Sequence, residues 1–188
     1  TLLDSSWWAM SSVELGDFNN DLKLDLVAVG SATNILSGNN TGHFTVLGNL
    51  NTGFAGGGDY SSTQGDFNHD NNLDLIVTYS NEDSFSVLLG NGDYSFQVPV
   101  KYYAGDRPME TITALMNNDN NLDLLIANDQ SNDVRIFVGN ANGTFQPGVS
   151  YVTGATPRGV AVADFNKDGF KDFAAANGNG NNLAVFLA

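Results

Sequence analysis

The chain has no cysteine, only two histidines and only seven Lys and Arg residues among its 188 residues. Without cysteine it can form no disulfide, no thiolate metal site and no cysteine nucleophile. Two histidines, His43 and His69, are too few for a multi-histidine zinc site, and we interpret both as surface residues. Because 21 Asp and Glu residues outnumber the seven basic ones, the net charge is −14, which excludes a generic basic surface for nucleic acid or for an anionic membrane.

Long apolar runs are also absent. Stretches such as Leu26–Val29 are far shorter than the ~20 residues that a membrane-spanning helix needs. No signal peptide is visible and the first residue is Thr1, so we expect a processed product, a fragment or an excised domain. The hydrophobic fraction of 41% is enough for the packed core of one domain.

Asparagine and glycine are abundant, with 25 and 21 copies. They separate short apolar segments that are rich in Leu and Val. This pattern predicts many short strands with tight turns and no helix.

One segment recurs four times at a fixed period. Its first acidic-loop positions are 17, 66, 115 and 164, so the spacing is 49 residues each time. The four copies are Gly16–Asp25, Gly65–Asp74, Ala114–Asp123 and Ala163–Asp172.

Each period predicts four strands, A to D, with the acidic segment between A and B. Strands B and C are apolar almost throughout, as expected when sheets are buried on both faces. We therefore predict an all-β fold, a β-propeller of four 49-residue, four-stranded blades that forms one domain over residues 1–188; an open solenoid is the alternative. The expected strands are Gly159–Ala163 for A; Leu24–Val29, Leu73–Thr78, Leu122–Ala127 and Lys171–Ala176 for B; Asn34–Leu36, Phe85–Leu89, Val134–Val138 and Leu183–Leu187 for C; and Thr45–Leu47, Gln97–Tyr102 and Gln146–Val152 for D.

The acidic loops, numbered 1 to 4 along the chain (17–25, 66–74, 115–123 and 164–172), follow the pattern D-x-N-x-D-x-x-x-D. Side-chain oxygens at positions 1, 3, 5 and 9, with a backbone carbonyl at position 7, are the hard ligands that Ca²⁺ prefers. A solvated Asp/Asn-rich turn is the alternative, but fourfold repetition favours a metal site over it. Ca²⁺ is expected rather than Mg²⁺, because Mg²⁺ keeps its waters and rarely takes a site made only of protein ligands. The predicted ligands are Asp17, Asn19, Asp21, Lys23 and Asp25; Asp66, Asn68, Asp70, Asn72 and Asp74; Asn117, Asp119, Asn121 and Asp123; and Asp164, Asn166, Asp168, Phe170 and Asp172.

The four loops are not equal. Loops 4 and 2 have Gly169 and Asn71 at position 6, where the chain must turn sharply. Loop 1 has Leu22 there, so we expect a distorted backbone. Loop 3 has Leu115 at position 1, so we expect a weak or empty site. Three bound Ca²⁺ ions would change the formal charge from −14 to −8.

The segments V-A-V-A-D-F-N-K-D-G-F-K-D-F (160–173) and I-F-V-G-N-A-N-G-T-F (136–145) resemble the FG-GAP/VCBS repeats. These are similar to the calcium-binding blades of the integrin α-subunit propeller and of propeller lectins. The resemblance covers essentially the whole chain. It implies a propeller with the acidic loops on one face and ligand binding on the other. Leu22 and Leu115 depart from the pattern, and so does the blade count, since relatives usually carry more than four.

Ring closure has three possible forms. Thr1–Asp4 aligns with strand D, and Ala188 aligns with the end of strand C. The N-terminal residues could therefore complete the last blade of the same chain or of a second copy, giving a four-bladed or an eight-bladed ring. We expect a homodimer, with a single-chain ring and an open fragment of a larger propeller as alternatives.

The sequence favours binding over catalysis. No nucleophile–base pair and no phosphate-binding glycine loop is evident, so we predict that the chain is not an enzyme. Loops on the face opposite the acidic loops carry Trp7 and Trp8, candidate ligand-binding residues that could instead fill a gap between blades. Other residues of these loops are Tyr79, Asp83, Arg107, Asp129 and Arg158.

We expect a calcium-binding recognition or adhesion module, extracellular or on the cell surface, with a protein or glycan ligand and calcium in a structural role. A propeller-type lectin is one alternative. A structural repeat segment, or an accessory domain of a larger secreted protein or hydrolase, is the other. A glycan array would distinguish the lectin from a protein-binding module.

Overall fold

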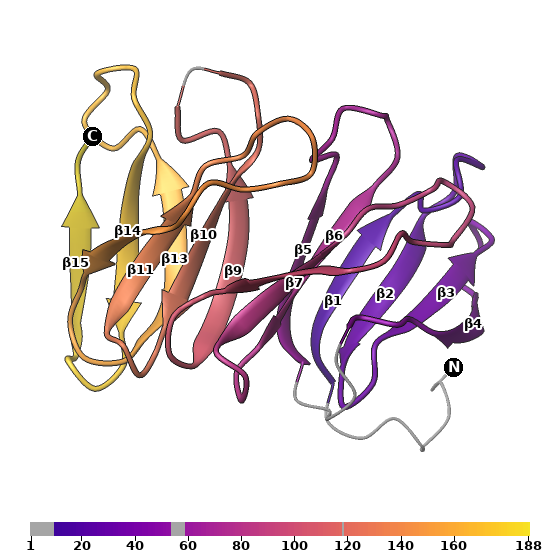
Figure 1. Ribbon diagram of the computed structural model, residues 1–188, viewed down its shortest axis with the longest axis horizontal. Coiled ribbons are helices and arrows are strands. Elements are labelled where there is room, and N and C mark those ends of the chain that lie inside the picture. Colours follow the sequence, from indigo (N-terminus) through magenta and orange to yellow (C-terminus); the bar gives the residue numbers. More distant parts are fainter. Residues whose placement is uncertain (1–9, 54–58, 118) are drawn as a thin grey trace.

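In the computed structural model, which describes residues 10–53, 59–117 and 119–188, strands form four antiparallel sheets. We call these sheets blades 1 to 4. They stand side by side in chain order, with blades 1 and 4 at opposite ends of the row, so the described residues do not close a four-bladed ring (Figure 1). The strands are β1 (Met10–Gly16), β2 (Asp25–Gly30), β3 (Asn34–Gly38) and β4 (Phe44–Asn49) in blade 1; β5 (Asp59–Gly65), β6 (Asp74–Tyr79), β7 (Ser84–Leu88) and β8 (Val100–Tyr103) in blade 2; β9 (Pro108–Ala114), β10 (Asp123–Asn128), β11 (Asp133–Phe137) and β12 (Val149–Val152) in blade 3; and β13 (Pro157–Ala163), β14 (Asp172–Asn177) and β15 (Asn182–Phe186) in blade 4.

The predicted all-β class is confirmed, and each blade is a meander in which consecutive strands pair. Strands β6 and β10 are buried along their whole length, as their continuous apolar sequences predicted. The part of the chain that the structure describes contains no helix, and hence none that could cross a membrane.

One strand prediction is not tested and another needs correction. Blade 4 has three strands among the described residues, and Thr1–Asp4, which could supply its fourth strand, lies outside them. The fourth strands of blades 2 and 3 begin later than expected, at Val100 and Val149. Proline precedes both starts, at 99 and 147, and it has no N–H to donate to a sheet.

The core consists of three apolar clusters, and each lies between two consecutive blades. Blades 2 and 3 bury one of them, where Phe85 and Phe67 of blade 2 meet Phe137 and Phe145 of blade 3. The other two clusters join blades 1 and 2, and blades 3 and 4, in the same manner. The fold is therefore stabilised by contacts between neighbouring blades, as in other repeat proteins.

The first strands of the blades also contact one another directly. Ser62 Oγ donates to Glu14 Oε1 (2.8 Å) between blades 1 and 2, and burial raises the pKa of the Glu14 carboxyl. Glu110 Oε2 accepts the Val160 N–H (2.6 Å) between blades 3 and 4. These bonds connect blade 1 to blade 2 and blade 3 to blade 4 through their first strands.

The two ends of the row expose apolar residues that are buried inside it. On blade 4, Leu183 and Val185 are 70% and 56% exposed, whereas the equivalent Phe85 and Val87 of blade 2 are 0% and 1% exposed. At the other end, Val13, Leu15 and Leu24 of blade 1 are all more than half exposed. Both ends thus present blade faces of the kind that pack together within the row.

Candidate metal-binding loops

All four acidic loops lie at the same end of the blades, the upper end in Figure 1, because each connects the first strand of its blade to the second. Loop 1 shows how the side chains shape the turn. The Asp17 carboxylate accepts the N–H groups of Asp21 (3.0 Å) and Leu22 (2.7 Å). The Asn19 amide oxygen also accepts the Asp21 N–H (3.2 Å), and the Asp21 carboxylate accepts the Lys23 N–H (3.0 Å). Positions 1, 3 and 5 therefore turn their oxygens toward the centre of the loop.

The same four hydrogen bonds occur in loops 2 and 4. In loop 4, Asp164 accepts the N–H groups of Asp168 (3.1 Å) and Gly169 (3.0 Å). The equivalent bonds of loop 2 join Asp66 to Asp70 (3.1 Å) and Asn71 (2.9 Å). Three loops with different residues at their variable positions have thus folded to one geometry.

The backbone of these loops is left-handed at positions 4 and 6. The φ angles are 60° and 65° in loop 1, 61° and 66° in loop 2, and 64° and 93° in loop 4. Leu22 occupies position 6 of loop 1 with φ 65°, so the expected distortion is absent and the leucine instead adopts a disfavoured conformation. Its side chain is 91% exposed, which leaves room for that conformation.

Loop 1 has an internal cation. The Lys23 ammonium lies 2.8 Å from Asp21 Oδ2 and lowers the pKa of that carboxyl. A metal ion in loop 1 would have to compete with this ion pair for Asp21. Loops 2 and 4 have Asn72 and Phe170 at the equivalent position and no such competitor there.

Loop 3 keeps only part of the pattern. Asn117 and Asp119 accept the N–H groups of Asp119 and Asn121 (both 2.9 Å). Leu115 at position 1 offers no side-chain acceptor, which removes the bonds that tie the start of the other loops to positions 5 and 6.

The aspartates at position 9 have a role that sequence reasoning missed. All four are fully buried, and both carboxylate oxygens of each accept backbone N–H groups. In loop 1, Asp25 accepts from Phe18 (3.0 Å) and from Gly38 (2.9 Å), at the end of strand β3. The equivalent bonds join Asp74 to Phe67 and Gly90, Asp123 to Met116 and Gly139, and Asp172 to Phe165 and Ala188. We call these four residues the anchor aspartates, because each holds its loop to its own blade.

The anchor aspartates differ in pKa. The pKa of Asp74 is raised to about 6, chiefly by burial and to a smaller extent by the carboxylates of Asp70 and Asp66, against the lowering effect of its two N–H donors. Burial also raises the pKa of Asp123. In contrast, the N–H donor of Ala188 lowers the pKa of Asp172.

Neighbouring loops are connected. Asn20 Nδ2, at position 4 of loop 1, donates to Asn72 Oδ1 at position 7 of loop 2 (2.8 Å). The exposed His69, at position 4 of loop 2, lies 3.0 Å from Asn121 Oδ1 of loop 3 in the same way. Both pairs are separated by 52 residues in the sequence. The sequence alone does not predict that these residues meet, because their contact results from the packing of consecutive blades.

The turn that follows the third strand of each blade also contacts the loop of the preceding blade. Tyr94 of blade 2 donates its N–H to the Phe18 carbonyl (3.2 Å) and its hydroxyl to Asp25 (3.1 Å). In blade 3, Gly143 donates its N–H to the Phe67 carbonyl (2.9 Å). Each of loops 1 and 2 is thus covered by the following blade.

The donor atoms of loops 1, 2 and 4 fit Ca²⁺ in chemistry: carboxylate and amide oxygens at positions 1, 3, 5 and 9 and a main-chain carbonyl at position 7. The described residues hold no cluster of three or more His, Cys, Asp or Glu side chains already converged for a metal. Burial is the main cause that raises the pKa of Asp74 to about 6, and the carboxylates of Asp70 and Asp66 contribute to it; a bound cation would relieve the repulsion from these two charges.

At the opposite end of the blades, several of the residues that we placed in loops contact other parts of the protein. Tyr79 is the last residue of β6 rather than a loop residue; it is buried and donates its hydroxyl to the Thr52 carbonyl. The Arg158 guanidinium binds Asp129 (3.0 Å) across blades 3 and 4. Asp83 accepts the Arg107 N–H (2.8 Å) across blades 2 and 3. Trp7 and Trp8 lie outside the described residues.

A search of curated proteins finds no match. Among solved structures, the holotoxin pore of the Photorhabdus luminescens Tc toxin is similar at a TM-score of 0.45 and 16% identity, and the match covers 100% of this chain but 10% of that one. The FG-GAP-like repeat model matches residues 17–77 and 116–175, which include acidic loops 1, 2 and 4 and all of loop 3 except Leu115. The chain therefore belongs to the FG-GAP-like repeat family and forms a β-propeller-like repeat module.

Proposed function

We propose that this module binds calcium at loops 1, 2 and 4 and uses the ions to hold together a non-catalytic recognition or adhesion surface. The observation that carries the proposal is that three loops of different sequence share one hydrogen-bond pattern and two left-handed residues at the same positions. Repetition of such a costly backbone geometry indicates a common ligand.

Each of the three loops would provide both side-chain and main-chain oxygens to its ion. Positions 1, 3, 5 and 9 would provide oxygens, and the carbonyls of Lys23, Asn72 and Phe170 would add a further donor in each loop. Bound calcium would supply positive charge where three carboxylates are crowded within nine residues. The loops would then remain closed and the neighbouring blades connected.

Calorimetric titration of the metal-free protein with calcium should give close to three sites per chain. Asp168→Ala in loop 4 should remove one site and part of the calcium-dependent rise in melting temperature. Asp119→Ala in loop 3, which lacks the carboxylate at position 1, should change either quantity much less. Full occupancy of loop 3, or equal losses for the two variants, would contradict the assignment.

The recognition surface is proposed for the end opposite the acidic loops. There, the connections 31–33, 80–83, 129–132 and 178–181 differ in sequence while the blades that support them repeat. Variable loops on a rigid scaffold are the common location of binding residues. An extracellular setting is consistent with this proposal, because the millimolar calcium found there would fill weak sites. The lectin alternative depends on Trp7 and Trp8, which lie outside the described residues.

We further propose that a second copy of the chain packs head to tail on the exposed faces of blades 1 and 4. The faces are complementary in size: blade 4 presents Ala161, Ala174 and Ala176, whereas blade 1 presents the larger Val13 and Leu15. At the equivalent positions inside the row, blade 2 has Ser62 and Gln64, and blade 3 has Thr111 and Thr113. Two such contacts would close a ring of eight blades and bury both apolar faces.

Light scattering in solution tests this pairing. The particle should have twice the 20.0 kDa chain mass. Val185→Glu on the open face of blade 4 should yield monomers, whereas Val149→Glu, on the fourth strand of blade 3, should leave the mass unchanged. A monomeric parent protein, or an open series of larger multimers, would rule out the closed pair without affecting the calcium proposal.

A further inference from the structure

The chain contains four Asn-Gly pairs, at 91–92, 142–143, 177–178 and 179–180, and all four lie among the described residues. Glycine has no Cβ, so the main-chain nitrogen that follows each asparagine is unhindered. Such a nitrogen can attack the side-chain amide carbon of the asparagine, which is the first step of deamidation. This attack needs a main-chain N–H that is free to lose its proton, and the four pairs differ in that respect.

Three of the four glycine N–H groups donate to main-chain carbonyls. The acceptors are the carbonyls of Phe67 for Gly143 (2.9 Å), Thr156 for Gly178 (2.9 Å) and Ala155 for Gly180 (3.3 Å). The Asn142 side chain is also restrained, because its Oδ1 accepts the N–H (3.1 Å) and the hydroxyl (2.6 Å) of Thr144. These three pairs can therefore react only in the fraction of molecules in which the turn has opened locally.

The Asn91-Gly92 pair, in the turn 90–96 after the third strand of blade 2, lacks these restraints. The Gly92 N–H has no acceptor in the part of the chain that the structure describes, and the Asn91 side chain is exposed. Asn91 Nδ2, the leaving group, donates to Ser95 Oγ (2.8 Å), while Oδ1 accepts from no described residue. Neither the attacking nitrogen nor the amide carbonyl is therefore held by another group.

The equivalent turn of blade 3 has alanine where blade 2 has Gly92. There, Asn140 makes the same bond as Asn91, from its Nδ2 to Thr144 Oγ1 (3.0 Å), but Ala141 follows it. The backbone is similar in the two turns, with φ 61° at Ala141 and 71° at Gly92. The Cβ of alanine hinders attack on the preceding amide, so Asn140 is a matched control within the chain.

We propose that Asn91 deamidates spontaneously in the folded protein and that the product loosens the contact between blades 1 and 2. The Gly92 nitrogen loses its proton and bonds to Asn91 Cγ, the bond from Cγ to Nδ2 breaks, and Nδ2 leaves with that proton as ammonia. Water then opens the succinimide ring. Cleavage at the side-chain carbonyl gives aspartate, and cleavage at the main-chain carbonyl gives isoaspartate, in which the main chain runs through Cβ and Cγ. Each product adds one negative charge.

Gly92 rests on the hydrogen bond that joins loops 1 and 2. A Cβ at this residue would lie 2.3 Å from both Asn20 Nδ2 and Asn72 Oδ1, the donor and the acceptor of that bond. Isoaspartate at position 91 adds a carbon to the main chain directly before Gly92. The added length would displace Gly92 from this contact.

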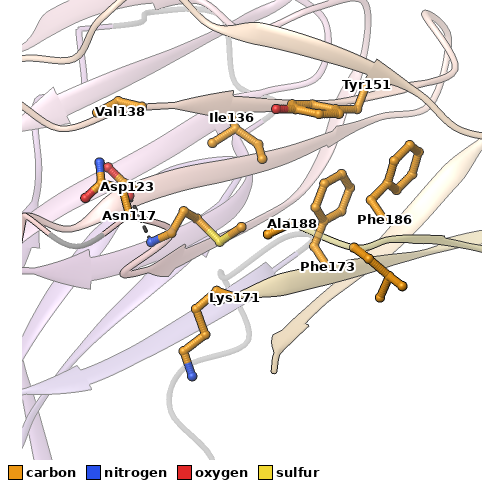
Figure 2. Close-up of a pocket in the computed structure, with 11 residues that line it drawn as sticks. Asn117, Asp123, Ile136, Val138, Tyr151, Lys171, Phe173, Phe186 and Ala188 are labelled. Carbon is orange, nitrogen blue, oxygen red and sulfur yellow. Dashed lines mark hydrogen bonds between the residues drawn. The ribbon is translucent and has the colours of Figure 1, made fainter. Parts of the chain in front are cut away.

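Tyr94, two residues further on, depends on the same main-chain register. It donates its N–H to the Phe18 carbonyl (3.2 Å) and its hydroxyl to Asp25 (3.1 Å) in blade 1. The residue beneath the turn is itself held by an anchor aspartate, since the Phe18 N–H donates to Asp25 (3.0 Å). Met116 donates to Asp123 (2.9 Å) in the same way, the bond drawn dashed at Asp123 in Figure 2. Because the acceptors are fixed, the turn must absorb the added carbon, and we expect Tyr94 to lose these contacts.

Ageing of the whole chain at mildly alkaline pH, followed by peptide mapping with mass spectrometry, tests the site. The incubation is done in EDTA, at a temperature where circular dichroism shows the folded state, so the result does not depend on calcium. Asn91 should be converted at least about tenfold faster than Asn142, whose Gly143 N–H is bonded, and Asn140 should stay intact. In urea, Asn91 and Asn142 should react at similar rates. Similar rates in the folded protein, or an Asn91 that reacts only in urea, would overturn the assignment of the site.

Asn91→Gln and Asn91→Asp separate the chemistry from its effect. Glutamine would have to form a larger ring, so the aged Asn91→Gln protein should keep its melting temperature. The isoaspartate form of the parent protein, separated by ion exchange and identified with isoaspartyl methyltransferase, should melt at a lower temperature than the fresh protein. Asn91→Asp, which has the added charge without the added main-chain carbon, should lose less. An isoaspartate form that melts together with the fresh protein would overturn the proposed loosening of the contact between the blades.

Discussion

Removal of calcium with EDTA should lower the melting temperature of this protein by more than about ten degrees. A site with an affinity near ~10 µM contributes roughly 2.7 kcal/mol of stability in ~1 mM calcium. Three such sites would contribute about 8 kcal/mol, comparable to the whole stability of a typical domain. For chains of this size each kcal/mol changes the melting temperature by about 2–4 °C. Carboxylates that are crowded without a cation, as around Asp74, supply the physical reason.

Scanning calorimetry at a series of calcium concentrations measures this effect. The melting temperature should keep rising with the logarithm of calcium concentration above saturation, as linkage requires for ligands that bind only the folded state. Magnesium at the same concentration should do much less, because it resists full dehydration. A melting curve that EDTA leaves unmoved would show that the acidic loops are solvated turns.

Substitution of an anchor aspartate should be the most damaging single change even in the absence of metal. Asp25→Ala removes the acceptor of the buried Phe18 and Gly38 N–H groups and of the Tyr94 hydroxyl. Each buried donor left without a partner costs about 1–3 kcal/mol. In EDTA we therefore expect a loss of roughly 2–6 kcal/mol in the free energy of unfolding, measured by urea denaturation.

Asp17→Ala in the same loop is the matched control. Its two N–H donors lie nearer the surface, where water can replace the lost acceptor, so in EDTA it should cost less than about 1 kcal/mol. In calcium both variants should also lose the contribution of loop 1. Equal costs in EDTA would mean that position 9 acts only as a metal ligand.

Much of the fold was predictable because the repeat period fixes the architecture. The 49-residue spacing, the apolar second and third strands and the turns between them were sufficient to predict stacked antiparallel sheets. The strand count of blade 4 was not predictable in this way, since it depends on which segment pairs with β15.

The ligand pattern of the candidate site was predictable from the sequence, but the other hydrogen bonds of its residues were not. A ligand pattern specifies which oxygens surround a loop, but not what else they bind, so the two buried N–H donors of Asp25 and its counterparts were missed. The low preference of leucine for the left-handed conformation also led to a wrong expectation for Leu22. The hydrogen bonds that Asp17 and Asn19 accept impose this conformation on the loop. Contacts between loops 52 residues apart, such as that of His69 with Asn121, follow only from the packing of blades.

Loops 1 and 2 are each covered by the following blade, so they are completed in a fixed order while the chain is synthesised. Loop 1 is complete in sequence at Asp25, but the Tyr94 hydroxyl that reaches this residue comes 69 positions later. A nascent chain emerging from the ribosome therefore finishes loops 1 and 2 only after most of the following repeat has been translated. For loop 1 the lag is 69 residues, more than one 49-residue repeat, so a ribosome that stalls before Tyr94 leaves this loop without its cover.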